Sequence, residues 1–136
     1  MAKIVKPLHV GISVAHMEEA LAWYSRNLGF HLVKDDGYVA PLEARICFVE
    51  RDGFQIELFE YKRPKPLPEE RRMPNSDLQT IGTKHVAFQV DDMAEMKRRL
   101  LENGTEIAHE TRMGTEHVLF IRDCSGVLIE LIQMSS

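Results

Sequence analysis

The two halves of the chain carry the same short pattern in the same order, and this duplication restricts the fold more than any other feature. Each half begins with His-Val and ends with Ile-Glu-Leu, three residues after a glycine. The pattern occupies 9–12 and 53–58 in the first half, and 85–88 and 126–131 in the second. Histidine and glutamate are 48 residues apart in one half and 45 in the other. Two copies are too few for a solenoid, so the pattern indicates a duplicated unit in a pseudo-twofold domain.

Length and composition exclude several classes of protein. A chain of 136 residues, 44% hydrophobic and 28% charged, predicts one globular domain over 1–136. The net charge of −4 argues against a nucleic-acid-binding surface, which is usually basic. We expect no membrane segment, because no apolar run approaches the roughly 18 residues of a spanning helix. Cys47 and Cys124 need not pair, and the N-terminal residues lack a signal-peptide profile, so we expect a cytoplasmic protein.

The first unit has the pattern of a strand, a helix and three further strands. In residues 7–14, Val10, Ile12 and Val14 share one face, which leaves His9 on the opposite face. Apolar residues at helical spacing follow, and a glycine stands where that helix should end. The predicted elements are strands at 7–14, 30–34, 44–50 and 54–61, a helix at 17–28 ended by Gly29, and a hairpin turn near Asp52-Gly53.

The second unit repeats this order. The predicted elements are strands at 84–90, 105–109, 116–122 and 127–133, and a helix from an Asp91 or Asp92 cap to about Asn103. Each unit is therefore βαβββ, and the fold class is α+β, with a curved mixed sheet that cups a site. The modules are expected at 1–62 and 83–136.

A connection rich in proline separates the two modules. Residues 63–82 contain four prolines with charged residues between them, which is incompatible with a regular core element. We expect partly polyproline II structure there, with Arg71 and Arg72 as solvated charges.

The chemistry is expected from the repeated histidines and glutamates. Glu57 and Glu130 stand between apolar neighbours on their strands, where a charged carboxylate is costly to bury unless it is paired or bound to a cation. A single glutamate of this kind is commonly exposed on a wet sheet face, and a single strand histidine is usually solvated. Four such residues in matching positions instead favour one divalent metal held by His9, Glu57, His85 and Glu130.

Two imidazoles and two carboxylates suit Zn, Ni, Co, Mn or Fe, and suit Mg less well. An octahedral ion with four protein ligands keeps two adjacent positions open for neighbouring oxygens of a substrate. The metal then acts as a Lewis acid and makes the carbon next to a carbonyl more acidic.

On these residues the chain resembles the vicinal oxygen chelate superfamily, in particular its glyoxalase I and methylmalonyl-CoA epimerase branches. The resemblance covers nearly the whole chain and is carried by the ligand positions, by the segment Lys84–Asp92 and by the ending Phe120–Leu131. It implies a glyoxalase/bleomycin resistance/dioxygenase-like fold, a small carbonyl substrate, a homodimer, and the same four ligands. Whether glutathione or coenzyme A is used stays open.

The resemblance implies a metal-dependent lyase or isomerase that transfers a proton through an enolate intermediate. Its catalytic residues would be Glu130, the first choice as base, and Glu57, the second. Glu43 lies about two residues from the position of a further glutamate in the epimerase pattern, and we expect it to be an exposed residue. Two alternatives stay open: an iron-dependent extradiol-type dioxygenase, and a non-catalytic small-molecule-binding protein of the antibiotic-resistance kind.

Five further polar residues are candidates for substrate binding. A histidine offers a second acid/base group or a hydrogen-bond donor to the substrate, and two arginines offer bidentate contacts to a carboxylate or phosphate. Two glutamines flank the ligand positions along the strands. They are His117, Arg45, Arg112, Gln55 and Gln89.

Overall fold

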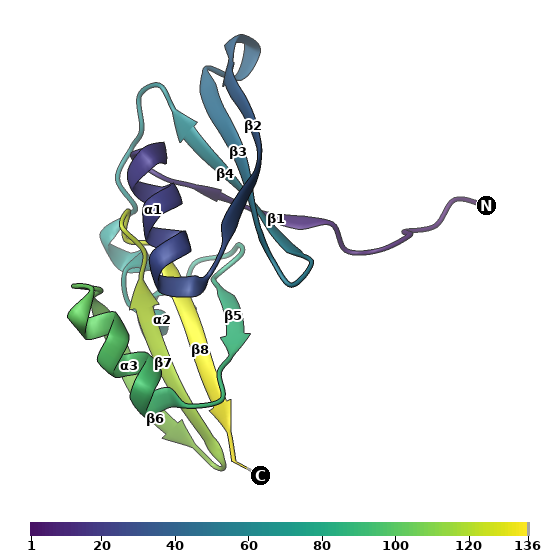
Figure 1. The fold of residues 1–136 in the computed structure, drawn as a ribbon. Helices are drawn as coiled ribbons and strands as arrows, with labels where there is room; N and C mark the ends of the chain where they lie inside the picture. The colour runs from purple at the N-terminus through teal and green to yellow at the C-terminus, as the bar shows by residue number, and fades with distance from the viewer. Residues whose placement is uncertain (136) are drawn as a thin grey trace. The chain divides into compact units, whose positions relative to one another are not determined.

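The chain folds into two compact units, each built round its own four-stranded sheet. The structure is a computed structural model and describes residues 1–135. The boundary between the units falls between Lys65 and Pro66. The predicted α+β class and the two βαβββ modules are confirmed (Figure 1), and the strands are divided equally between two mixed sheets rather than joined in one.

The first unit contains a sheet with strand order β1-β4-β3-β2, in which β1 runs parallel to β4 and the other neighbours are antiparallel. Its elements are β1 (His9–Ser13), α1 (Met17–Leu28), β2 (His31–Val39), a 3-10 helix (Ala40–Leu42), β3 (Ala44–Arg51) and β4 (Phe54–Tyr61). Helix α1 ends at Gly29, which adopts the left-handed conformation (φ 73°) that glycine accepts without strain.

The second unit repeats the topology, with strand order β5-β8-β7-β6 and β5 parallel to β8. Its elements are a 3-10 helix (Glu69–Arg71), α2 (Pro74–Asp77), β5 (Val86–Gln89), α3 (Met93–Glu102), β6 (Ile107–Met113), β7 (Glu116–Arg122) and β8 (Leu128–Met134). Asp92 caps α3 by accepting a hydrogen bond from the Glu95 N–H at 3.0 Å. Of the two predicted caps, Asp91 and Asp92, the second is the one that caps the helix.

In both units the last strand is tied to the start of the helix. The Met17 N–H donates to the Glu60 carboxylate at 2.7 Å, and the Met93 N–H donates to the Gln133 side-chain oxygen at 2.6 Å. Both acceptors lie three residues after the repeated glutamate of their strand. The duplication therefore extends to a contact that holds each helix on its sheet.

The core of each unit lies on the helix face of its sheet. On β4 and β8 the residues on both sides of the repeated glutamate are fully buried, because they face the helix layer; they are Ile56, Leu58, Ile129 and Leu131. Alternation along a strand then sends Glu57 and Glu130 to the opposite face. The apolar pattern of the sequence thus positions the two carboxylates.

The edge strands differ most from the sequence prediction. Strand β2 continues five residues beyond 34, and β6 runs to Met113 instead of ending at 109. Both strands are polar in these stretches and both carry register shifts against their neighbours. Edge strands tolerate charged residues and bulges, which the alternation rule does not capture.

The connection also differs from the prediction. The sequence predicts no regular core element and partly polyproline II structure there, whereas the connection contains α2 and a 3-10 helix. From Pro66 onward it belongs to the second unit. Arg71 and Arg72 are not simply solvated: the Arg71 side chain pairs with Asp77 at 2.9 Å, and the Arg72 side chain lies 3.8 Å from the Glu106 carboxylate. The buried Asp77 accounts for the difference at Arg71.

Within residues 1–135, none of the helices is long and apolar enough to cross a membrane.

Candidate metal centre

The first half-site joins the start of β1 to the middle of β4. The parallel register places Gly11 beside Glu57, so His9, two residues earlier, lies on the same face as Glu57. The His9 Nε2 atom is 3.1 Å from Glu57 Oε1. The His9 and Glu57 side chains are 28% and 20% exposed, so both stay accessible to a small ligand.

The second half-site repeats this geometry. Register pairs Ala87 with Glu130, and His85 again lies two residues before the paired position. The His85 Nε2 atom is 3.3 Å from Glu130 Oε1, with 22% and 18% of the two side chains exposed. The repeat seen in the sequence is therefore a repeat of one contact.

A phenylalanine completes each half-site, and sequence reasoning missed both. Phe48 on β3 pairs in register with Glu57, and its ring meets the His9 ring edge-on, with centroids 5.3 Å apart. Phe120 on β7 pairs with Glu130 and meets the His85 ring in the same way at 5.0 Å. Extending each hairpin register from the repeated glutamate would have found them. The rings limit the orientations that the imidazoles adopt.

The donors fit a divalent metal. Nitrogen and carboxylate oxygen ligands lie about 2.0–2.2 Å from ions such as zinc, so two ligands at right angles are about 3 Å apart. The separations of 3.1 and 3.3 Å match neighbouring ligands of one ion. Among residues 1–135, no three or more His, Cys, Asp or Glu side chains are gathered into one ligand group.

Two nitrogen-bearing residues lie beyond the phenylalanines on the edge strands. Lys34 on β2 pairs in register with Phe48, and its Nζ atom lies 5.6 Å from the ring centroid. In the second unit the register places His109 of β6 beside Phe120. The bulge in each edge strand changes the alternation there, so the sequence pattern gave no signal for either residue.

Arg45 and His117 occupy equivalent positions, each three residues before the phenylalanine and therefore on the helix face of its sheet. Arg45 pairs with Glu18 of α1 at 2.6 Å and with Asp35 of β2 at 2.7 Å. His117 pairs with Glu110 of β6 at 2.7 Å. The two residues lie on the opposite face from the repeated glutamates, with their hydrogen-bonding groups engaged.

These ion pairs perturb the acids involved. The hydrogen bond from Arg45 lowers the pKa of Asp35 to about 2. The hydrogen bond from Lys97 of α3 lowers the pKa of Glu110 most, and the hydrogen bond with His117 lowers it further. Burial, with a smaller contribution from Asp35, raises the pKa of the Cys47 thiol to about 11. The helix face therefore holds fixed charges that tie helix and edge strand to the sheet.

The remaining candidates are dispersed. Gln55 lies on the face of Glu57 and donates to Glu50 at 3.0 Å. Gln89 lies on the strand face of Ala87 and is exposed. Arg112 is exposed and pairs in register with His117. Glu43 has a positive φ of 52° at the end of the 3-10 helix. Its carboxylate accepts hydrogen bonds from Tyr61 and Arg63.

Comparisons with known proteins show the family and the fold. The family model for the Glyoxalase/Bleomycin resistance protein/Dioxygenase superfamily matches residues 6–131. A probable lactoylglutathione lyase of Synechocystis sp. is 27% identical over 138 residues, covering 95% of each chain. Among solved structures, a glyoxalase family protein from Enterococcus faecalis has a TM-score of 0.78 at 19% identity, covering 94% of this chain and 97% of its own.

The fold is also similar to that of a genomically encoded fosfomycin resistance protein from Listeria monocytogenes. That structure has a TM-score of 0.74 at 16% identity, covering 98% of this chain and 96% of its own. Such likenesses in structure show a shared fold, whereas the family model spans both repeats and both histidine–glutamate pairs. The chain belongs to the Glyoxalase/Bleomycin resistance protein/Dioxygenase superfamily, the vicinal oxygen chelate superfamily that its sequence resembles.

Proposed function

We propose that the chain is a divalent-metal-dependent lyase or isomerase that acts on a small carbonyl compound. The observation that carries this proposal is the pair of equivalent half-sites, each with a histidine nitrogen and a glutamate oxygen 3.1 or 3.3 Å apart. The histidine and glutamate side chains of both pairs are between 18% and 28% exposed, so their nitrogen and oxygen atoms stay open to a ligand.

The proposed ligand set is His9, Glu57, His85 and Glu130, for one Zn, Ni, Co, Mn or Fe ion per chain. Two imidazoles and two carboxylates form the borderline-to-hard donor set that these ions accept. A divalent ion bound there would supply Lewis-acid polarisation of neighbouring substrate oxygens. Phe48 packs edge-on against the His9 ring, and Phe120 packs in the same way against the His85 ring.

The protein would then supply the proton transfer. Glu130 is proposed as the base that takes the proton from the carbon next to the carbonyl. In an isomerisation it returns the proton to the neighbouring carbon, and in an epimerisation it returns the proton to the opposite face of the same carbon. Glu57, its equivalent in the first unit, is the second candidate. A positioned carboxylate acting in this way typically contributes about 10²–10⁴-fold to rate.

The relative from Synechocystis sp. supports the lyase part of the proposal, because it is a probable lactoylglutathione lyase. The hemithioacetal of methylglyoxal and glutathione is therefore the first probe, since its isomerisation gives that compound. Methylmalonyl-CoA is the second probe, because its epimerisation also exchanges a proton next to a carbonyl. We also propose a homodimer, on the family resemblance, and sedimentation velocity tests it.

Solvent deuterium incorporation tests the function directly. Metal-loaded protein is incubated with each probe in D2O, and the carbon-bound proton is followed by NMR. For the probe that exchanges, Glu130→Gln is expected to lower the exchange rate by about 10²–10⁴-fold. Glutamine keeps the size of the side chain and removes the basic oxygen.

Glu60→Gln is the matched control. Glu60 lies on the same strand as Glu57 but on the helix face, and glutamine retains the acceptor for the Met17 N–H. We expect this variant to exchange within about twofold of the wild type, as for substitutions outside the site. Exchange that persists in both Glu130→Gln and Glu57→Gln would refute the assignment of the base.

A further inference from the structure

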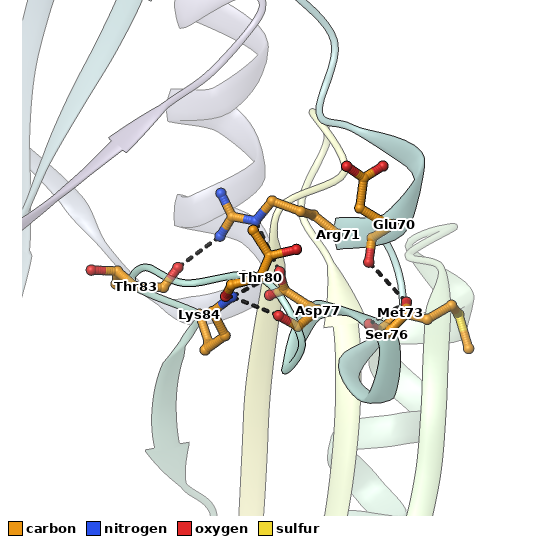
Figure 2. A network of polar contacts seen from close by, with 8 residues as sticks. All are labelled: Glu70, Arg71, Met73, Ser76, Asp77, Thr80, Thr83 and Lys84. Atoms are coloured by element: carbon orange, nitrogen blue, oxygen red, sulfur yellow. Dashed lines mark hydrogen bonds and ion pairs between the residues drawn. The ribbon is translucent and has the colours of Figure 1, made fainter.

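A polar network holds the segment that leads to His85 (Figure 2). Asp77, at the end of α2, is 2% exposed, and its carboxylate accepts a hydrogen bond from Arg71 at 2.9 Å and one from Lys84 at 3.2 Å. Lys84 also donates to the Asp77 carbonyl at 2.6 Å and to the Thr80 carbonyl. Arg71 also donates to the Thr83 carbonyl at 2.7 Å.

The network uses the hydrogen-bonding capacity of Lys84 fully. An ammonium group has three donors, and all three are directed at the turn between Asp77 and Thr80. A buried carboxylate is stable only with partners of opposite charge, and removing one partner of such a pair is strongly destabilising. The buried Asp77 therefore fixes Arg71 and Lys84, and these fix the backbone immediately before His85.

The first unit positions its histidine by different means. Strand β1 begins at His9, which pairs in register with Gln55, so the ladder itself holds the histidine. All eight residues before His9 are exposed. Strand β5 begins at Val86, which leaves His85 just outside the ladder. The two half-sites match in geometry, but only the second adjoins a buried ion-pair network.

We infer that Asp77, Arg71 and Lys84 form a clamp that positions His85 against Glu130 and Phe120. The clamp replaces the strand pairing that His9 has and His85 lacks. Its members are positioning residues that act through His85. The geometric part of this inference stands on the contacts above, and its effect on metal affinity rests on the proposed function.

NMR of the metal-free protein tests the geometry. The His85 ring lies edge-on to Phe120, and the His9 ring edge-on to Phe48, so both imidazoles report on the ring beside them. Histidine-labelled Asp77→Asn and Lys84→Met are compared with the wild type, with folding verified by circular dichroism. We expect the His85 ring resonances to move toward unfolded-state positions and those of His9 to stay unchanged.

Lys97→Met is the matched control, because Lys97 pairs with Glu110 at 2.6 Å on the helix face of the same unit. It should leave both rings unchanged. Unchanged His85 resonances in folded Lys84→Met would overturn the clamp, as would equal movement of His9 and His85. Lys84→Met keeps the inference testable if Asp77→Asn fails to fold.

Metal titration separates this inference from the proposed function. If the wild type binds metal, the two clamp variants should bind about 10–100-fold more weakly, as for other residues that orient a ligand. If the wild type binds no metal but the clamp variants show the expected movement of the His85 resonances, the proposed function is refuted and the clamp is supported. Unchanged metal affinity together with unchanged resonances would refute the clamp alone.

Discussion

The helix tether offers a quantitative test of the duplicated architecture, because the two units solve the same problem with different side chains. Helix α1 begins at Met17, whose preceding residue provides no side-chain cap, and the N–H of Met17 is satisfied by the charged Glu60. Helix α3 begins at Met93, whose N–H is satisfied by the neutral Gln133. A glutamate accepts the hydrogen bond and also interacts with the helix dipole, whereas a glutamine only accepts the bond.

The expected free energies of unfolding follow from these two contributions. Losing the acceptor costs about 1 kcal/mol, and losing the charge at a helix N-terminus costs about 0.3–1 kcal/mol. Glu60→Ala should therefore destabilise by about 1–2 kcal/mol, and Glu60→Gln by about 0.3–1 kcal/mol. Gln133→Ala should cost about 1 kcal/mol. Gln133→Glu should stabilise by about 0.3 kcal/mol, the low end, because Asp92 already brings a negative charge to that end.

Urea denaturation at low and high salt measures all four variants. In high salt, the differences in unfolding free energy between glutamate and glutamine at each position should shrink, because salt screens the interaction with the helix end. The loss of stability on substitution of glutamine by alanine should persist. A loss of stability in Glu60→Gln as large as that in Glu60→Ala, or an unchanged stability in Gln133→Ala, would contradict these tethers.

Two further predictions concern the helix face of the first unit. Cys47 is fully buried with a pKa raised to about 11, so alkylation of the native protein at pH 8 should modify Cys124 first, as read by mass spectrometry; equal labelling would contradict this. The pKa of Asp35 is lowered from 3.8 to about 2, so its contribution to stability is present above pH 3.8 and lost as the pH falls toward 2. The stability difference between wild type and Asp35→Asn should therefore shrink over that range in urea titrations, and a constant difference would exclude the ion pair with Arg45 as its source.

The sequence predicts the parts of this structure that depend on periodicity. The buried residues beside Glu57 and Glu130 form an alternating pattern, so the faces of β4 and β8 follow from it directly. Helices α1 and α3 also follow, because their apolar spacing is regular and glycines stand near their ends. The repeat further identifies which residues pair, since His9–Glu57 and His85–Glu130 are equivalent contacts.

The rest depends on information that periodicity does not carry. Phe48 and Phe120 each lie beside the glutamate of their own half-site because of the hairpin register. A shift of one residue in that register would turn them to the other face of the sheet. Arg45 and His117 are candidates for substrate binding by residue type. Each stands three residues before a phenylalanine of its strand, so its side chain lies on the helix face of the sheet. Asp77 lies in a proline-rich stretch with no pattern, and its burial depends on partners that only the folded chain brings together.

The measurement that tests the central proposal most directly is the metal content of the protein and of matched histidine variants. Tag-free wild type, His9→Ala, His85→Ala and His31→Ala are purified, loaded with a divalent ion and examined by elemental analysis. His31 is an exposed histidine at the start of β2 and serves as the control.

We expect one ion per chain in the wild type and in His31→Ala, and loss of the ion in both His9→Ala and His85→Ala. Retention of the ion by either half-site variant would contradict a shared ligand set. Absence of metal from the reconstituted wild type would contradict the proposed function, and stoichiometric iron with oxygen uptake on catechols would replace it with a dioxygenase.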